Sequence, residues 1–346
     1  MTEQIPKYEF LSEEKTNEML KLFKGERTGW VMVSPKRYIF PLRFIEQGAG
    51  FYNIKARSDD TWVMSYPRSG TTWTQELVWL LSNNLNFDLA KSRLLNERFP
   101  FLEFSLFNHA EVTLEFLSEN QDDKAKQQFC KDIAKPGYEV VNAMPSPRFI
   151  KTHFPLSMLP GLLDVGCKVI YVARYVKDVA VSWFYLNKTI RTQGYIGDFA
   201  TFWDYFQNDL TAYSPYWSHL KEAYALKDHP NLLFIFYEEM QHDFPKVIKK
   251  VAKFLNKTYS DEEICKISDY LDIKNFRNNE MVNYSEFRAC GIIKPEHPFV
   301  RKGGSGGWKN FFTPELNAKA DKWIEENLKD TDLHFPFFNN HINNNN

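Results

Sequence analysis

Cysteine pairs, long apolar runs and a substantial net charge are all missing from this chain of 346 residues. The four cysteines are widely separated and form no C-x-x-C or Cys/His zinc pattern, so we expect reduced thiols and no metal site. No apolar stretch approaches the roughly 18 residues that cross a bilayer, and the start MTEQIPKYEF has no signal-peptide pattern. These absences predict a cytoplasmic protein without a membrane partner.

The net charge of −1 provides no global field for nucleic acid, so an anionic ligand must be held by local basic clusters. The chain has no internal repeat and no long Gly/Ser linker. We therefore expect one domain over residues 1–346, with a frayed tail at 339–346. Aromatic residues make up 16% of the chain, which fits an aromatic core or a pocket for a large apolar ligand, and composition alone favours the core.

Four short apolar runs predict the buried strands of a parallel sheet, at residues 61–66, 148–151, 168–172 and 231–236. Helical patterns lie between them, for example at 72–84 and 177–190. This alternation predicts an α/β fold with a central parallel sheet flanked by helices. Ligands of such folds bind at the carboxyl ends of the strands.

The stretch WVMSYPRSGTTW, residues 62–73, predicts a strand, a phosphate-binding type of loop and the start of a helix. Backbone N–H groups and the dipole at a helix start favour an anion, and Gly70 permits its close approach. Arg68 adds a planar fork for two anionic oxygens. The GxxxxGK[ST] spacing and an obvious Mg²⁺-binding Asp are absent, which disfavours a nucleoside triphosphatase or kinase. On these residues alone, a helix capped by Ser69 is the simpler interpretation.

Three other segments carry polar groups suited to an anion site. PRFIKTHFP ends a predicted strand with Lys151 and His153, and this placement makes His153 a better general base than the other histidines. YVARYVKDVAVSWF and RKGGSGGWKNFF contribute further cationic and hydroxyl groups, namely Arg174, Ser182, Arg301 and Lys302.

In this order, YPRSGTTW, PRFIKTHFP, YVARYVKDVAVSWF, FIFYEEM and RKGGSGGWKNFF resemble the cytosolic sulfotransferase family, over roughly residues 59–313. The resemblance implies the cofactor 3′-phosphoadenosine 5′-phosphosulfate (PAPS), its product 3′-phosphoadenosine 5′-phosphate (PAP), and no metal. The 5′-phosphosulfate would be bound by Arg68, Ser69, Gly70, Thr71 and Thr72. The remaining cofactor contacts would be Trp73, Tyr237 and Ile273 at the adenine, and Arg174, Ser182, Arg301, Lys302 and Gly303 at the 3′-phosphate.

The resemblance also implies catalytic roles. His153 would take the proton from the acceptor hydroxyl, and Lys151 would lie near the sulfuryl oxygens. Arg68 stands where the family usually has Lys; it can hydrogen-bond the leaving oxygen but is a poor proton donor. Ile273 replaces the usual Phe, so this position offers no ring for stacking.

The segment that the family uses for dimers matches only in part. Lys309 and Thr313 agree with it, whereas Pro314 and Ala318 replace the usual Val and Glu. The sequence therefore leaves a homodimer open.

Residues 105–150 form a longer segment than most family members carry. Within it, NQDDKAKQQFCKDIAK predicts a helix with Asp122 and Asp123 in its first turn and a thin apolar stripe of Ala125, Phe129 and Ile133. An ordinary surface helix explains this pattern alone. With the resemblance, we expect a helical lid at about 105–147 over a pocket lined by Phe99, Phe101, Phe104, Leu106 and Phe107.

An enclosed aromatic pocket suits a long apolar alcohol such as retinol. Sulfuryl transfer to it would either end at a sulfate ester or continue, by loss of sulfate from an allylic ester, to an alkene. A stable ester of an alcohol or phenol is therefore the first alternative. The second is a non-catalytic carrier of an apolar ligand, which would have no need of a base such as His153.

Overall fold

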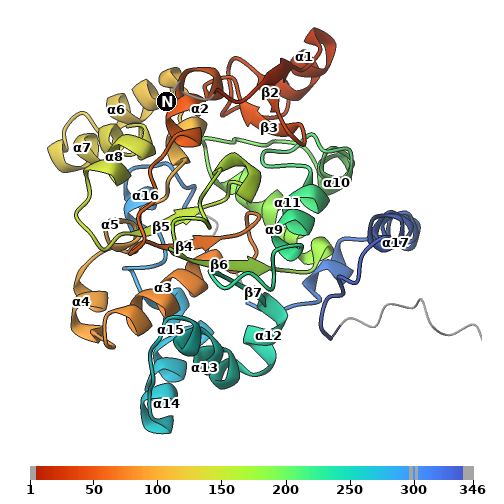
Figure 1. Cartoon of the computed structure of the whole chain (residues 1–346). Helices are drawn as coiled ribbons and strands as arrows, with labels where there is room; N and C mark the ends of the chain where they lie inside the picture. The colour runs from red at the N-terminus through yellow and green to blue at the C-terminus, as the bar shows by residue number, and fades with distance from the viewer. Residues whose placement is uncertain (1–4, 296–298, 301–302, 338–346) are drawn as a thin grey trace, which may run out of the picture.

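The computed structural model describes residues 5–295, 299–300 and 303–337. Its central sheet has four parallel strands in the order β5–β4–β6–β7. The strands are β4 (Thr61–Met64), β5 (Phe149–Thr152), β6 (Lys168–Ala173) and β7 (Leu232–Phe236). Each coincides with one of the four predicted runs, so the α/β fold with a central parallel sheet is confirmed (Figure 1).

Both faces of the sheet are covered by helices because alternate strand residues point to opposite sides. One face buries Val63, Ile170, Val172 and Ile235 against α3 (Thr71–Ser82), α13 (Phe244–Phe254) and α14 (Asp261–Tyr270). The other face buries Trp62, Met64, Tyr171 and Phe234 against α9 (Val176–Thr189), α10 (Phe199–Gln207) and α11 (Tyr216–Tyr224). This two-sided burial explains the continuous apolar runs in the sequence.

A second, antiparallel sheet of three short strands, β1 (Tyr8–Phe10), β2 (Trp30–Val33) and β3 (Tyr38–Pro41), was not predicted. Its strands have three or four residues each and give almost no periodic signal. Ile39 exchanges two backbone hydrogen bonds with the loop before α11, at 2.9 Å to Ser214 and 3.0 Å from Tyr213. The second sheet thereby fixes the loop that carries Tyr213.

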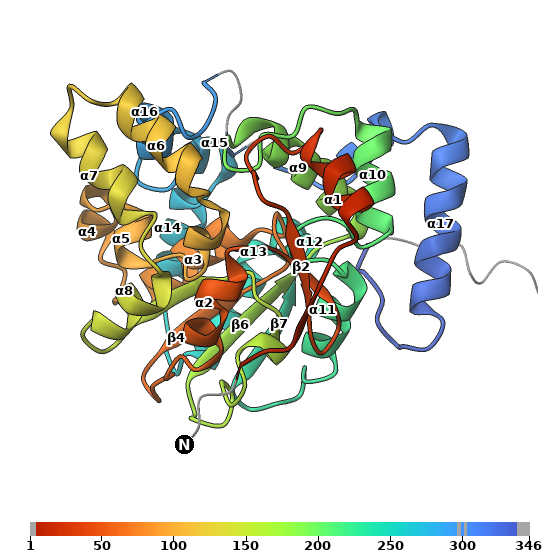
Figure 2. The same ribbon diagram turned by 90° about the horizontal axis from the view of Figure 1, so that it is seen from above.

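The segment expected to form a lid contains three helices, α6 (Ala110–Glu119), α7 (Lys124–Asp132) and α8 (Gly137–Ala143). Figure 2 shows α6 and α7 next to α16 (Ser285–Ala289), far from them in the sequence. Asp123 is the N-cap of α7 rather than part of its first turn. The expected apolar stripe is confirmed in part: Phe129 and Ile133 pack against an apolar cluster, but Ala125 is exposed and the buried residue of α7 is Cys130.

The remaining elements are α1 (Glu13–Leu20), α2 (Phe44–Tyr52), α4 (Phe87–Ser92), α5 (Leu95–Arg98), η1 (Phe104–Phe107), η2 (Leu156–Met158), α12 (Tyr237–His242), α15 (Ile273–Asn278), η3 (Gly307–Asn310) and α17 (Pro314–Leu328). Thr313 and Pro314 start α17, where the Thr313 hydroxyl accepts from the backbone N–H of Leu316. None of the described helices has the length and apolarity to cross a membrane. The tail at 339–346 lies outside the described residues.

Candidate active site

A cavity of about 550 Å³ opens at the carboxyl ends of the strands. One end is bounded by the loop after β4 and the glycine-rich segment near residue 304; the other end is bounded by aromatic side chains. Of the described site residues that the sequence predicted, it brings together Arg68, Gly70, Thr71, Thr72, Trp73, Lys151, His153, Arg174, Ser182, Tyr237, Ile273 and Gly303. Ser69 is buried in the same loop, and Arg301 and Lys302 lie outside the described residues.

The loop after β4 turns sharply into α3. Arg68 has a φ of 70° and Gly70, the N-cap of α3, has a φ of 102°, so both lie in the left-handed region. A Cβ at position 70 would lie 2.5 Å from the ring of Tyr237, which explains why only glycine fits here. α3 therefore begins at the cavity wall, and the backbone N–H groups in the first turn of a helix favour an anion.

Two arginines cross this end of the cavity. Arg68 donates from Nε to the Ser182 hydroxyl at 3.0 Å and from a terminal nitrogen to the Phe299 carbonyl at 3.0 Å. Arg174 donates to the Arg68 carbonyl at 3.0 Å and to the Gly304 carbonyl at 2.9 Å. Its guanidinium lies 4.4 Å from the centre of the Tyr237 ring. Positive charge is thus concentrated where the loop begins.

The glycine-rich segment is tied to the same cluster. The Gly304 N–H donates to the Tyr237 hydroxyl at 3.3 Å, and the Gly306 N–H donates to the Asp178 carboxylate at 2.7 Å. Gly303 has a φ of 59° and lies against the side chain of Ile273. These contacts hold the segment over the cavity end that the basic side chains occupy.

Trp73 lines the cavity, and its indole is fixed by contacts on the side away from the cavity. Its indole stacks on Phe244 with ring centres 4.5 Å apart, and its Nε1 donates to the Leu271 carbonyl at 2.9 Å. Tyr237 meets it edge to face at 5.9 Å. Because its edge and one face are already engaged, only the remaining ring surface is offered to a flat ligand.

His153 is oriented by the strand next to it. Its Nδ1 lies 2.9 Å from the Ser65 carbonyl, and because a carbonyl can only accept, Nδ1 carries the proton. Burial and the neighbouring Lys151 hold the pKa of His153 well below its usual value, so the ring is neutral. Its Nε2 therefore has a free lone pair, and within the described part of the chain it has no hydrogen-bond partner. This is the arrangement of a general base.

Lys151 lies beside His153, and only 4% of it is exposed. Its ammonium donates to the Tyr284 hydroxyl at 3.2 Å and lies 4.1 Å from the centre of the Phe101 ring. Phe101 is placed there by parallel pairing with Lys151 at the edge of β5. Burial lowers the pKa of Lys151 to about 7, with the charge of Arg68 acting in the same direction and that of Glu103 opposing it.

Sequence reasoning missed Glu103, a fully buried carboxyl next to the backbone of His153. It accepts hydrogen bonds from the His153 backbone N–H at 2.6 Å, the Thr152 hydroxyl at 2.7 Å and the Tyr213 hydroxyl at 3.1 Å. Burial raises its pKa to about 7. One acidic residue inside the aromatic run FPFLEFSLF was the available signal.

The aromatic end of the cavity differs from the expected lining. Phe101, Phe104 and Phe107 line it, but Phe99 packs on Phe149 and Leu106 lies in the main apolar core. Phe99 and Leu106 are therefore corrected to core positions. The lining that the sequence did not indicate comes from distant segments, and includes Trp183, Tyr213, Tyr284, Phe287 and Phe299.

The donor set fits a large anionic nucleotide. Two buried groups here, the Ser69 hydroxyl and the Arg174 Nε–H, have no hydrogen-bond partner among the described residues. Both can donate to anionic oxygens, as can the backbone of the loop. The described residues contain no cluster of three or more His, Cys, Asp or Glu arranged to hold a metal.

Comparisons with known proteins agree with this geometry. Sulfotransferase 1E1 of Bos taurus is 31% identical over 85% of this chain and 91% of its own length. Luciferin sulfotransferase of Photinus pyralis is 32% identical over 86% of this chain and 80% of its own length.

Two crystal structures of retinol dehydratase are similar over nearly the whole chain. One contains androsterone and the inactive cofactor PAP, with a TM-score of 0.90; the other contains retinol and PAP, with a TM-score of 0.89. Both are 36% identical and cover 96% of this chain and 99% of theirs. Residues 58–332 match the sulfotransferase domain family. The chain therefore belongs to the sulfotransferase family.

Proposed function

We propose that this sulfotransferase binds PAPS and acts on a hydrophobic alcohol, retinol, which it converts to anhydroretinol through a transient sulfate ester. The carrying observation is the neutral His153, whose free Nε2 faces a cavity walled by aromatic rings beside Lys151. A polar base with a buried cation, enclosed by apolar walls, suits an acceptor whose only polar group is one hydroxyl.

The likeness to retinol dehydratase supports this choice of acceptor. It extends over 96% of the chain, so it includes most of the segment that holds α6, α7 and α8. One similar structure contains retinol and the other contains androsterone, each a hydrophobic alcohol. We infer that the cavity takes acceptors of this class.

The donor end would hold PAPS through the loop and the basic side chains. When bound, PAPS supplies the sulfuryl group that passes to the acceptor oxygen. The loop N–H groups and the Ser69 and Thr72 hydroxyls would bind its 5′ end, and Arg174 and Ser182 its 3′-phosphate. Arg301, Lys302 and Gly303 would complete the site. Tyr237, Trp73 and Ile273 would enclose the adenine, with Ile273 offering apolar contact and no stacking.

His153 would remove the proton from the acceptor hydroxyl. Its Nδ1–H bond to Ser65 fixes the ring, and the low pKa keeps Nε2 unprotonated at neutral pH. As the proton arrives, the Ser65 carbonyl stabilises the imidazolium. A positioned base of this kind contributes about 10²- to 10⁴-fold in rate.

Lys151 and Arg68 would neutralise the charge of the transferring group. A buried ammonium beside an anion is electrostatically strong because no water screens it. Arg68 keeps its proton, so it would stabilise the leaving oxygen by hydrogen bonds without protonating it. With Arg68 in place of the usual Lys, the positive charge beside the leaving oxygen is therefore kept, but proton donation to that oxygen is not expected.

The aromatic lining of the cavity would also favour elimination of sulfate from the ester. Sulfate leaves with the electron pair of the allylic C–O bond and accepts the proton that the conjugated cation then loses, which gives the alkene. The faces of rings such as Phe101, Phe104 and Tyr284 stabilise a delocalised cation, and the exclusion of water prevents its capture as an alcohol. Two outcomes compete with this proposal: a stable sulfate ester, and a carrier that performs no chemistry.

Identification of the reaction products distinguishes the three candidate functions. The protein is incubated with PAPS and retinol, and the organic products are identified by chromatography and mass spectrometry. We expect anhydroretinol with one PAP released per alkene. Androsterone is the matched control, because its carbinol is not allylic and its product should remain an ester. Retinyl sulfate as the final product would establish the ester-forming alternative, and no product from either alcohol would favour the carrier.

A further inference from the structure

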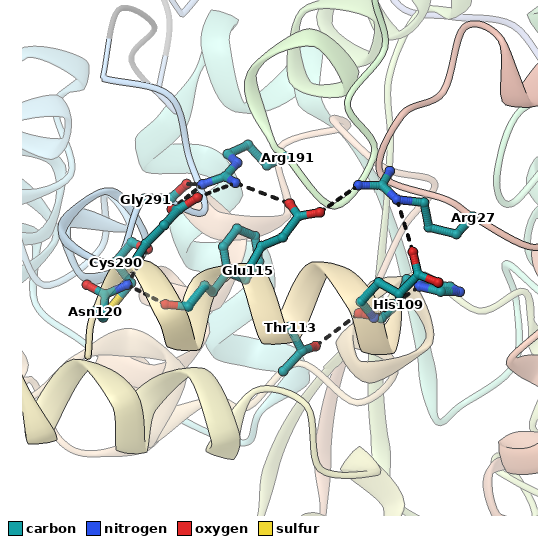
Figure 3. A network of polar contacts seen from close by, with 11 residues as sticks. Arg27, His109, Thr113, Glu115, Asn120, Arg191, Cys290 and Gly291 are labelled. Atoms are coloured by element: carbon teal, nitrogen blue, oxygen red, sulfur yellow. Dashed lines mark hydrogen bonds and ion pairs between the residues drawn. The ribbon is translucent and has the colours of Figure 1, made fainter.

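The seam between the inserted helices and the rest of the molecule contains a network of charged contacts (Figure 3). Glu115 of α6 contacts Arg27 at 2.9 Å on one side and Arg191 at 3.4 Å on the other. Arg191 also pairs with Glu119 at 2.6 Å and donates to the Gly291 carbonyl at 3.1 Å. The network joins α6 to two segments that belong to the core.

Two buried cysteines lie on the two sides of the same seam, one on α7 and one at the end of α16. Cys130 is the buried residue of α7, and Cys290 is the buried C-cap of α16. Each thiol lies close enough to the other to affect its pKa. The Cys290 sulfur also lies 4.0 Å from the Lys126 carbonyl, one helical turn before Cys130. Both side chains belong to one small apolar cluster.

We propose that Cys130 and Cys290 are a redox site, whose disulfide fastens α7 to the end of α16 and keeps the cavity closed. The cysteines belong to different layers of the fold, one to the insertion and one to the core. A bond between them would therefore join two surfaces that must separate if the insertion is to open. No other pair among the described cysteines shares this relation: Cys167 donates to the Leu162 carbonyl, and Cys265 is exposed on α14.

The seam is connected directly to the cavity. Phe129 of α7 packs edge to face on Phe287 of α16 at 5.2 Å, and Phe287 packs on Phe104 at 5.3 Å. Phe104 and Phe287 both line the cavity. A covalent bond one residue from Phe129 therefore restrains part of the cavity wall, and passage of a long acceptor past that wall would slow.

The oxidant that we propose is a small disulfide such as oxidised glutathione. One cysteine thiolate attacks a glutathione sulfur, the glutathione S–S bond breaks and one glutathione thiolate leaves. The second cysteine thiolate then attacks the mixed disulfide and releases the second glutathione. Two protein thiols are oxidised to one disulfide, and one glutathione disulfide is reduced to two thiols.

The closed seam protects the two thiols from this reaction. Burial raises the pKa of both, that of Cys290 to about 12, so almost no thiolate forms while the seam is closed. Separation of α7 from α16 restores ordinary thiol acidity and admits the oxidant. The site would thus respond to oxidant only in molecules whose insertion opens.

The test uses the full chain with Cys265→Ser, which removes the exposed thiol. The protein is treated with oxidised glutathione, digested without reduction and analysed by peptide mass spectrometry. We expect a peptide pair linked through Cys130 and Cys290, slower hydrogen exchange in α6 and α7, and at least a fivefold fall in acceptor turnover that dithiothreitol reverses. The linkage and the exchange are measured without any activity, so they remain readable even if the proposed acceptor is wrong.

Matched variants complete the test. Cys130→Ala and Cys290→Ala should each keep their turnover in oxidised glutathione, whereas Cys167→Ala should respond like the parent protein. The proposal is overturned if no linked peptide forms under conditions that modify Cys265 fully in the wild type. It is also overturned if the linked protein exchanges and turns over like the reduced one. Because the linked peptide is sought in the parent protein, misfolding of an alanine variant cannot decide the outcome.

Discussion

Arg68 donates a 3.0 Å hydrogen bond to the hydroxyl of Ser182, a residue 114 positions away in the sequence. The resemblance to the family assigns Arg68 to the phosphosulfate end of the cofactor and Ser182 to the 3′-phosphate end. The guanidinium spans these two regions and also lies 4.8 Å from the centre of the Phe299 ring. Cofactor binding should therefore exchange part of this network for anionic oxygens.

Removal of the Arg68 side chain tests its role. We expect Arg68→Ala to lower kcat by about 10²- to 10³-fold, because one charged donor to the leaving oxygen is lost. Arg68→Lys keeps the charge and should retain more activity than Arg68→Ala. Steady-state kinetics at saturating acceptor measure this. Arg37→Ala, which breaks an exposed pair with Glu9, is the control and should be silent. Wild-type kcat in Arg68→Ala would remove this residue from the transition state.

Loss of the proposed base should separate chemistry from binding. We expect His153→Ala to lower kcat by about 10³-fold, because among the described residues no other histidine lines the cavity. Binding of PAP, followed by calorimetry, should remain within a few-fold of wild type. His334→Ala changes an exposed histidine and serves as the control. Turnover that survives in His153→Ala would show that the base is elsewhere.

The pH dependence of PAPS capture should follow Lys151. Its cationic form attracts the anion, and burial lowers its pKa to about 7, so the cation is lost as the pH rises above that value. We expect kcat/KM for PAPS to fall about tenfold per pH unit on the alkaline side, because this ratio reports the free enzyme. Lys151→Met should be slower at neutral pH and lack this limb. An unchanged alkaline limb in Lys151→Met would assign the titration to another group.

Glu103 should couple stability to pH. Burial raises its pKa from 4.5 to about 7, so between these values the folded protein retains a proton that the unfolded chain has released. The free energy of unfolding should therefore decrease as the pH rises through this window. Urea unfolding of wild type and Glu103→Gln measures the difference, since the amide does not titrate. If the free energies of unfolding of the two proteins change with pH in the same way, the titration does not belong to Glu103.

The same carboxyl also holds the backbone of His153, the proposed base, in place. Glu103→Ala leaves three buried donors without their acceptor, which should cost about 3 kcal/mol or more of unfolding free energy. Glu46→Ala, on the exposed side of α2, is the control. Equal urea midpoints for the two variants would show that water replaces the carboxyl.

The ionic seam should influence the products. Arg191→Ala removes the pair with Glu119 and the contact with Glu115, so α6 should exchange hydrogen faster. Water then reaches the cavity more often, and sulfate esters can escape before elimination. We expect a higher ratio of ester to alkene, increased further by salt. A constant ratio across Arg191→Ala and the control Arg37→Ala would separate the seam from the chemistry.

The parallel sheet was predictable because each strand is buried on both faces, which leaves a continuous apolar run in the sequence. The loop at 68–72 and the ends of β5 and β6 could be placed for the same reason, since ligands of parallel sheets gather at one edge. Much of the cofactor end of the cavity comes from such positions, whereas Gly303 and Ile273 lie on segments that do not follow a strand.

The residues that line the acceptor end of the cavity could not be predicted in this way. Tyr213 reaches the cavity because the unpredicted second sheet holds its loop. Tyr284 and Phe287 belong to the single helix α16 and its N-cap, more than a hundred residues from Lys151. Phe99 and Leu106 share an aromatic run with true lining residues, but the direction of each side chain depends on the pairing of this run with β5. The burial of Glu103 beside His153 could not be predicted either, because it depends on the same pairing. Such contacts are set by tertiary packing, which leaves no period in the sequence.

The most direct test of the proposed chemistry is a single turnover with PAPS that carries radiolabelled sulfur. Enzyme in excess is mixed with labelled PAPS and retinol, and the reaction is quenched in acid-free solvent at successive times. The account predicts that label passes from PAPS into an organic ester and then into inorganic sulfate, while anhydroretinol appears at the rate of the second step. Label that remains in the ester, or alkene that forms without transfer of label, would contradict it.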